Sequence, residues 1–280
     1  MWDFAGQSVY YNTHQFFLTS RAVYILVWNV RLGAEYAGLD FWLSSISCHA
    51  PGAPIFIVGT HIDQVSTYSL NRESLKARFP QIAGFHFVSS YTGQGINEFA
   101  SMLVEVTLQQ KYIGENIPQF WFNFEKTVRA LGASKFLIPY SEMVEIALEN
   151  GLFDEQEILQ GIRFLADLGS IQYFETSGLK DKIVINPQWI VDVMACLVSV
   201  KKTCVNDGRF RHEDVATIWC DYDSCLHEWI LKLTEEFDLT YRVPDSDMSL
   251  VPCLLPDVEP TDYEWPDLQQ NSAKVSSSFF

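Results

Sequence analysis

Short apolar runs alternate with amphipathic stretches through the first hundred residues of the chain. The apolar runs are rich in β-branched and aromatic residues, which is typical of strands buried on both faces of a parallel sheet. They span residues 23–30, 55–59 and 85–88. Between and after them, apolar residues recur at helical spacing over residues 39–47, 70–78 and 96–109. This alternation predicts an α/β domain over residues 1–112.

From residue 113 the pattern becomes mainly helical. Helical spacing covers residues 121–131, 140–149 and 154–168, with Pro118 before the first helix and Gly169 as a carboxyl cap of the third. Strand-like runs at 170–175 and 182–185 follow. Two helices and a hairpin in this order predict a winged-helix-like unit.

The remaining residues complete the predicted domain organisation. Further helices are expected over residues 187–199 and 223–237, so that a second, mainly α domain occupies residues 113–256. Residues 257–280 turn acidic and then serine-rich without apolar periodicity. We predict a disordered tail there.

The charge balance bears on what the winged-helix-like unit binds. The sequence holds 19 basic and 35 acidic residues, for a formal net charge of −16. The predicted recognition helix offers a single basic residue, Arg163, among four acidic ones: Asp154, Glu155, Glu157 and Asp167. Such a face repels phosphates, so we expect a packing or interaction module and no nucleic-acid partner.

The cysteine content and the hydropathy indicate a cytoplasmic protein. Six cysteines are too sparse for a disulfide scaffold and suit reduced thiols. The longest apolar runs fall far short of the roughly 20 residues of a membrane helix, and the start of the sequence lacks the layout of a signal peptide. We therefore expect no transmembrane segment.

A loose group of potential zinc ligands occurs near the end of the second domain, at His212, Cys220, Cys225 and His227. The usual spacing of paired zinc ligands is absent. Cys225 and His227 lie two positions apart in a predicted helix and so point to different sides of it. We interpret these residues as ordinary thiols and imidazoles.

The segment Asp3–Gln7 has the form D-x-x-G-Q. In nucleotide hydrolases this turn holds magnesium through its Asp by way of water, and its Gly amide meets the terminal phosphate. The following Gln can orient the attacking water. Asp3 is therefore a candidate for magnesium and nucleotide binding, Gly6 for phosphate binding and Gln7 for catalytic water positioning.

Two further motifs follow the second and third predicted strands. Asp63 closes a Gly-Thr-His-Ile-Asp segment, where its carboxylate can accept hydrogen bonds from guanine N1 and the exocyclic amine. Ser89 and Ser90 precede a Gly93–Gly95 turn, where backbone amides can meet the guanine carbonyl oxygen. Because the carboxyl ends of parallel strands meet at one edge of the sheet, order and spacing together predict a guanine site.

These motifs resemble those of a known family. Trp2–Gln7, Thr13–Phe17 and Val58–Asp63 look like the Roc GTPase domain of Roco proteins, and Val27–Asn29 and Phe41–Leu43 point toward the animal leucine-rich-repeat serine/threonine kinases. The later segments Phe174–Glu175, Asn186–Trp189 and Leu250–Pro252 resemble the COR domain, which follows Roc in that family. The resemblance covers residues 1–256.

The resemblance implies an incomplete Ras-like (P-loop GTPase) parallel sheet followed by a mainly α COR domain. It implies GTP or GDP and Mg²⁺ as ligands of the parent protein, a GTPase-regulated serine/threonine kinase of intracellular signalling. Thr60 and His61 replace the Asn-Lys pair of ordinary Ras-like proteins, as is usual in this family. The implied nucleotide contacts are thus Thr60, His61, Asp63, Ser89 and Ser90, with Asp63 carried over most directly. Roco proteins vary at the position of Gln7, and homodimerisation through Roc and COR stays open.

One part of a GTPase is missing from this sequence, the phosphate loop of the form G-x-x-x-x-G-K-S/T. The nearest string, Gly33 to Gly38, lacks the Lys and the hydroxyl. The Ras-like order places that loop before Met1 and its strand beside residues 23–30, whose apolar edge would then be open. We expect a fragment that lacks the phosphate loop and the kinase domain and does not hydrolyse GTP alone. The alternatives are a chain that borrows a strand from a partner and a nucleotide-independent interaction scaffold.

Overall fold

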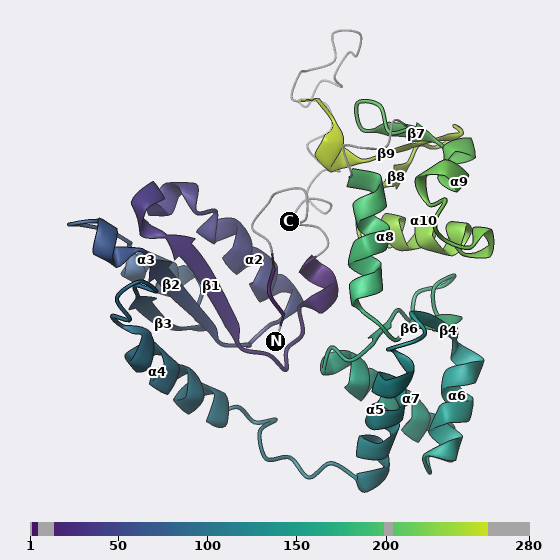
Figure 1. Ribbon diagram of the computed structural model, residues 1–280, viewed down its shortest axis with the longest axis horizontal. Helices are drawn as coiled ribbons and strands as arrows, with labels where there is room; N and C mark the ends of the chain where they lie inside the picture. Colours follow the sequence, from purple (N-terminus) through teal and green to yellow (C-terminus); the bar gives the residue numbers. More distant parts are fainter. Residues whose placement is uncertain (1, 5–13, 199–203, 257–280) are drawn as a thin grey trace, which may run out of the picture.

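The computed structural model describes residues 2–4, 14–198 and 204–256 (Figure 1). Gly6, Gln7 and the predicted tail at 257–280 lie outside the described residues. The described residues form an amino-terminal domain (residues 14–108), a middle unit (119–185) and a carboxyl-terminal unit (188–254), each with its own secondary structure. The predicted second domain therefore contains two hydrophobic cores.

The amino-terminal domain is built on a parallel sheet of order β1-β2-β3, made of β1 (Tyr24–Asn29), β2 (Ile55–Thr60) and β3 (Ile82–Phe87). Helices α2 (Leu39–His49) and α3 (Arg72–Arg78) pack on one face, and α4 (Ile96–Leu108) covers the other (Figure 1). Short 3-10 turns connect them: η2 (Gln15–Phe17), η3 (Val30–Leu32), η4 (Ala34–Tyr36) and η5 (Ile62–Gln64). Strand β2 is buried from Ile55 to Gly59, as its unbroken apolar run predicts.

Strand β1 forms one edge of this sheet, because within the described ranges it pairs with β2 alone. Its Ile25 and Val27 are exposed by 42% and 58%. An apolar outer strand of this kind is what the Ras-like resemblance implies for residues 23–30.

Strand β3 begins three residues before the predicted start, at Ile82. Its pairing with β2 shifts after Ile55, where Ala83 is left over in the register. A Cβ at Gly84 would lie 2.9 Å from His86 Nε2 and 3.3 Å from the Phe56 ring. Because glycine has no side chain, β3 can lie this close to His86 and Phe56. Ala and Gly are weak strand formers, which is why the sequence pattern missed this start.

The middle unit contains every element predicted for residues 118–185, and one strand more. In chain order it comprises α5 (Gln119–Leu131), β4 (Leu137–Pro139), α6 (Tyr140–Glu149), α7 (Glu155–Asp167), β5 (Gln172–Tyr173) and β6 (Lys182–Val184). The strands form an antiparallel sheet of order β4-β6-β5. Gly169, with φ of 70°, ends α7 as predicted: its N–H bonds to Ala166 O at 2.8 Å, and that of Ser170 bonds to Leu165 O at 3.0 Å.

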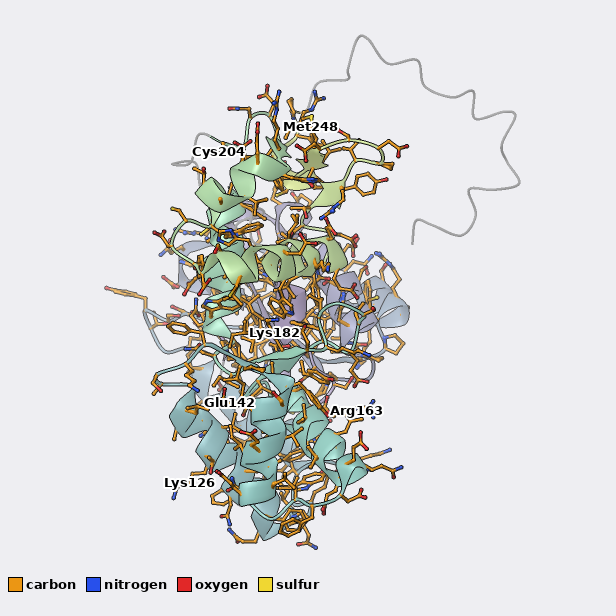
Figure 2. The ribbon with its side chains drawn as sticks, turned by 90° about the vertical axis from the view of Figure 1, so that its right-hand side faces the viewer. Lys126, Glu142, Arg163, Lys182, Cys204 and Met248 are labelled. Atoms are coloured by element: carbon orange, nitrogen blue, oxygen red, sulfur yellow. The ribbon has the colours of Figure 1, made fainter. Side chains whose placement is uncertain are left out.

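The carboxyl-terminal unit comprises helices and a small antiparallel sheet of order β7-β9-β8. Its elements are α8 (Gln188–Val198), β7 (Arg209–Arg211), η6 (His212–Asp214), α9 (Val215–Ile218), η7 (Ser224–Leu226), α10 (His227–Glu236), β8 (Tyr241–Arg242), β9 (Met248–Leu250) and η8 (Pro252–Leu254). This sheet is not predicted from the sequence pattern, because strands of two or three residues carry too little periodicity. Figure 2 shows this unit, marked by Cys204 and Met248, above the middle unit, marked by Glu142 and Lys126.

Among the described residues, η2 and Arg21 contact the middle and carboxyl-terminal units and the segment before them. Phe16 and Phe17 of η2 are buried in the core of the carboxyl-terminal unit, where the Phe16 ring lies 4.0 Å from that of Phe237. Arg21, just before β1, forms an ion pair with Glu115, and its guanidinium lies 5.3 Å from the ring of Phe164 on α7.

Candidate functional site

The carboxyl ends of β2 and β3 bring four of the predicted site residues together: Thr60, His61, Asp63 and Ser89. The Thr60 hydroxyl donates to Trp28 O on the neighbouring strand at 3.1 Å and lies 2.9 Å from His61 Nδ1. The Ser89 hydroxyl, two residues after the end of β3, is the main cause that lowers the pKa of the Asp63 carboxyl, through hydrogen bonding. The site is thus built at one edge of the parallel sheet, as the sequence order predicts.

Backbone conformation directs these side chains outward from the sheet. Gly59 lies between Val30 and Phe87, where a Cβ would come within 2.7 and 2.8 Å of their side chains. His61 adopts the left-handed conformation, with φ of 66°, and turns the chain from β2 into η5. This sharp turn brings Asp63 near Ser89, which lies two residues after the end of β3.

Asp63 carries an ionised carboxylate that faces solvent. The hydrogen bond from Ser89 is the main cause that holds its pKa below the usual aspartate value, and the Asp63 backbone amide and the Gln64 side chain act in the same direction. Ser89 is fully buried, and its Oγ also accepts the Thr92 N–H at 3.1 Å. A carboxylate fixed in this way keeps acceptor positions for two neighbouring N–H groups of a ligand.

The loop after β3 leaves few backbone amides for a ligand. Ser89 N–H donates to Gln94 O at 3.0 Å and Gly93 N–H to Ser89 O at 2.9 Å. The amides of Thr92 and Gln94 donate to the side-chain oxygens of Ser89 and Thr92. Ser90 is the other predicted site residue of this loop, and it is exposed. Its amide takes no part in the four hydrogen bonds given above.

Of the predicted phosphate-sensing residues, the structure describes Asp3. Asp3 is exposed and lines a cavity of about 260 Å³ beside β1, whose other lining residues include Phe4, His14 and Trp42 but none of the base-site residues. Asp3 is the sole carboxylate among the lining residues. Since magnesium sites commonly combine one or two carboxylates with phosphate oxygens, Asp3 fits Mg²⁺ in combination with a bound nucleotide. Gly6 and Gln7 lie outside the described residues.

Three residues at this edge of the sheet were not predicted: Asn29, Arg31 and Gln64. Asn29 Oδ1 accepts hydrogen bonds from both the backbone N and the Nε of Arg31, each at 3.1 Å. Arg31 Nη1 donates to Gln64 Oε1 at 2.8 Å. Arg31 and Gln64 belong to no recognisable motif. Asn29 lies in the Val27–Asn29 segment of the family resemblance and near the end of the first predicted strand, and these were the signals available.

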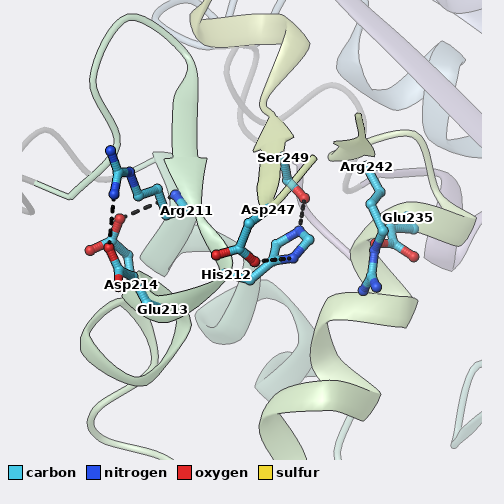
Figure 3. A network of polar contacts seen from close by, with 8 residues as sticks. All are labelled: Arg211, His212, Glu213, Asp214, Glu235, Arg242, Asp247 and Ser249. Atoms are coloured by element: carbon cyan, nitrogen blue, oxygen red, sulfur yellow. Dashed lines mark hydrogen bonds and ion pairs between the residues drawn. The ribbon is translucent and has the colours of Figure 1, made fainter. Parts of the chain in front are cut away.

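The loose set of potential zinc ligands is divided among separate contacts. Figure 3 shows His212 between two residues, with its Nδ1 3.0 Å from Asp247 Oδ1 and its Nε2 3.1 Å from Ser249 Oγ. His227 Nε2 instead lies 3.0 Å from the carbonyl oxygen of Trp219. Over the described ranges, no group of three or more His, Cys, Asp or Glu side chains is placed to hold a metal ion.

The helices of the described residues are also too short or too polar to cross a membrane.

Two family models match the chain. The model described as "C-terminal of Roc, COR-A domain" matches residues 118–255. The model described as "Ras of Complex, Roc, domain of DAPkinase" matches residues 1–63. The first model covers both the middle and the carboxyl-terminal unit, and the second includes the D-x-x-G-Q turn and Asp63.

Curated relatives match most of this chain within much longer chains, and the chain spans 8% to 15% of the three described below. The probable serine/threonine-protein kinase pats1 of Dictyostelium discoideum is 35% identical over 91% of this chain, which spans 8% of that protein. The probable serine/threonine-protein kinase roco6 of the same organism is 30% identical over 89% of this chain, which spans 12% of it. The mouse leucine-rich repeat serine/threonine-protein kinase 1 is 25% identical over 91% of the chain.

A solved structure agrees in fold over most of the chain. The structure described as Methanosarcina barkeri Roco2 RocCORdC bound to GDP superposes with a TM-score of 0.81 at 28% identity. It covers 91% of this chain and 79% of its own. The family models, the relatives and the fold agree with the sequence motifs, and the chain belongs to the Roco family, with a Ras-like Roc domain followed by COR.

Proposed function

We propose that the chain recognises the base of a guanine nucleotide as part of a GTPase-regulated serine/threonine kinase that acts in intracellular signalling. The observation that carries this proposal is the ionised Asp63 carboxylate, fixed by the buried Ser89 at the strand ends. Asp63 accepts the guanine N1–H and the exocyclic amine, and the Ser90 amide meets the guanine carbonyl oxygen. Thr60 and His61 shape the turn that presents Asp63. The GDP named in the description of the Roco2 structure supports this ligand class.

At the phosphate end, we assign Asp3 to water-mediated Mg²⁺ binding, Gly6 to the terminal phosphate and Gln7 to positioning of the attacking water. The sequence contains no phosphate loop with its Lys, so much of the charge-assisted hydrogen bonding to phosphate is missing from this chain. We therefore expect negligible GTP hydrolysis by the 280-residue chain alone. GTP turnover by the purified chain that disappears in Gln7→Leu would contradict this.

The base assignment is tested by exchanging hydrogen-bond polarity at position 63. In Asp63→Asn, the carboxamide can donate to the C2 oxygen of xanthine but loses one acceptor for guanine. We expect the ratio of GDP to XDP affinity, measured by calorimetry, to fall by on the order of a hundredfold, because two charge-assisted hydrogen bonds are affected.

The control is Asp245→Asn, which removes the same charge from an exposed turn with φ of 56°, a conformation that Asn tolerates. This control should keep the wild-type ratio. An unchanged ratio in Asp63→Asn would refute the base assignment.

A role as a nucleotide-independent interaction scaffold is the second candidate, favoured by the burial of Phe16 and Phe17 in the carboxyl-terminal unit. Homodimerisation through Roc and COR belongs to this proposal. Light scattering of the full chain with and without GDP tests it, because a strictly monomeric chain in both states would leave no self-association. We also propose a cytoplasmic location, which the six free cysteines support.

A further inference from the structure

The Tyr91 side chain projects from the loop after β3 into solvent. It is 90% exposed, more than any other large hydrophobic side chain of the described residues, and Tyr36 follows at 79%. Covering the apolar faces of an aromatic ring is favourable, while the tyrosine hydroxyl can stay in water. Because binding residues often stand on loops held by a rigid sheet, the Tyr91 ring is a candidate contact for a ligand.

The backbone on both sides of Tyr91 is held by hydrogen bonds within the loop. Ser89 N–H donates to Gln94 O at 3.0 Å, which closes the loop at its base. Gly93 N–H donates to Ser89 O at 2.9 Å, and Thr92 N–H donates to Ser89 Oγ at 3.1 Å. Ser89 is also fully buried. The ring is thus exposed on a fixed loop, so a ligand that covers it has little backbone freedom to remove.

Strand pairing places this loop beside the turn that carries Asp63. Gly59 and Phe87 are partners in the register of β2 and β3. One residue further on, Val88 N–H donates to Gly59 O at 2.8 Å. The chain therefore leaves β3 toward Tyr91 at the same edge of the sheet at which it leaves β2 toward Asp63.

We propose that the Tyr91 ring stacks on one face of the guanine base whose edge is bound by Asp63 and the Ser90 amide. This role rests on the proposed function, because it requires a base at that edge. Hydrogen bonds to Asp63 and Ser90 lie in the plane of the base and leave its two faces uncovered. A flat aromatic ring that follows Ser90 in the chain covers such a face, and every base has a π face on which it can stack.

The two kinds of contact have different consequences for selectivity. Asp63 meets groups on the base edge, which differ between guanine and xanthine. The Tyr91 ring meets the π face, which both bases share, so it contributes affinity and no selectivity. Loss of the ring should therefore weaken GDP and XDP binding by the same factor.

Calorimetry of the 280-residue chain with GDP and with XDP tests this role. In Tyr91→Ala we expect the affinity for each nucleotide to fall by about tenfold, the usual effect of removing one stacking ring, with the GDP/XDP ratio unchanged. Tyr91→Phe keeps the ring and should bind as wild type does. Tyr91→Leu keeps apolar bulk without a flat face and should recover only part of the loss.

The matched control is Tyr241→Ala, which removes a tyrosine of the carboxyl-terminal unit that is 56% exposed and should leave both affinities unchanged. Wild-type GDP affinity in Tyr91→Ala would overturn the inference. So would a Tyr91→Leu variant that binds as well as Tyr91→Phe, because apolar bulk alone would then be sufficient. A changed GDP/XDP ratio in Tyr91→Ala would assign the residue to the base edge and reject stacking.

A second readout reports the contact itself. When GDP is added, NMR resonances of the Tyr91 ring protons should shift upfield, because they lie over the ring current of the base, and show nuclear Overhauser contacts to the base proton. If wild type binds GDP and XDP equally, the proposed role of Asp63 is wrong, yet this shift still decides whether a base covers Tyr91. No shift of the Tyr91 resonances at millimolar GDP would reject the inference.

Discussion

At the scale of single residues, the proposed base site depends on small side chains and unusual backbone conformations as much as on its polar groups. A Cβ at position 59 would clash with the side chains of Val30 and Phe87, and Gly59 has none. His61 adopts the left-handed conformation, with φ of 66°. The motif residues Asp63 and Ser89 could be predicted from the sequence because each follows an apolar strand. Arg31 and Gln64 could not, because their hydrogen bonds depend on where two neighbouring strands end.

The loop after β3 provides a matched pair of glycines for a first prediction. Gly93 and Gly95 have φ of 77° and 76°, but a Cβ at Gly95 would lie 2.4 Å from Phe87 O, whereas the one at Gly93 meets open space. Gly93→Ala should cost about 1–2 kcal/mol of unfolding free energy, the penalty of the left-handed conformation. Gly95→Ala should cost about 1–3 kcal/mol more, because the backbone must also move.

Urea unfolding measures both variants, and GDP affinity reports whether the loop has shifted. Gly95→Ala should weaken GDP binding, since the loop carries Ser89 and Ser90, while Gly93→Ala should leave it close to wild type. Equal costs for the two variants would show that the contact with Phe87 O has no effect on the loop.

At the scale of elements, long periodic segments were predicted well and short strands were missed. Helix α6 has the predicted bounds, Tyr140–Glu149, because ten residues of regular spacing define a helical face. The predicted helix at 223–237 begins instead as the 3-10 turn η7, and α10 starts at His227. Strand β4 pairs with β6 and strand β7 with β9, which lie about 40 residues further along the chain, and sequence periodicity does not report such pairing. Strand β8 has only two residues.

A second prediction concerns η2, which belongs by sequence to the amino-terminal domain but packs elsewhere. Phe16 is 4% exposed and contacts the rings of Phe174 and Phe237. Phe16→Ala should therefore lower the unfolding free energy by about 3–5 kcal/mol, the usual cost of truncating a buried phenylalanine. The loss should be seen in the unit that contains the buried Trp219 and Trp229.

Tryptophan fluorescence during urea unfolding makes this measurement. The control is Phe122→Ala on α5, whose side chain is 58% exposed and which should change stability by no more than about 0.5 kcal/mol. A Phe16 variant as stable as the Phe122 variant would mean that η2 does not contribute to the core of the carboxyl-terminal unit.

At the scale of the whole molecule, the Roc sheet and the two COR units are held together by a few side chains. The Arg21 guanidinium lies over the rings of Tyr112 and Phe164 while it pairs with Glu115, so one residue joins β1, the connecting segment and α7. Within the amino-terminal domain, His14 stacks on Trp42 of α2 with ring centroids 5.0 Å apart. These contacts join residues that lie far apart in sequence.

A third prediction follows from the burial of His14, which lowers its pKa below 6.5. The unfolded chain then takes up a proton at a higher pH than the folded chain does. Stability should accordingly fall as the pH drops from about 6.5 toward the lowered pKa of the folded state, and change no further from this group below it. His86, whose pKa is also lowered by burial, acts in the same direction.

Urea unfolding at several pH values tests this slope. His14→Phe keeps an aromatic ring beside Trp42 and removes the proton, so it should flatten the dependence. His49→Gln changes an exposed histidine at the end of α2 and should retain it. A wild-type slope in His14→Phe would assign the pH dependence to other groups.

The sequence by itself determined the order of the elements, the α/β and mainly helical segments, and the placement of the proposed base-site residues after apolar strands, because these depend on local periodicity and on motif spacing. Only the tertiary structure decided that the second segment has two cores, that Phe16 is buried in one of them, and that Asn29, Arg31 and Gln64 are joined by hydrogen bonds at the strand ends. Contacts between residues far apart in the chain leave no periodic signal, since they arise when separate elements pack.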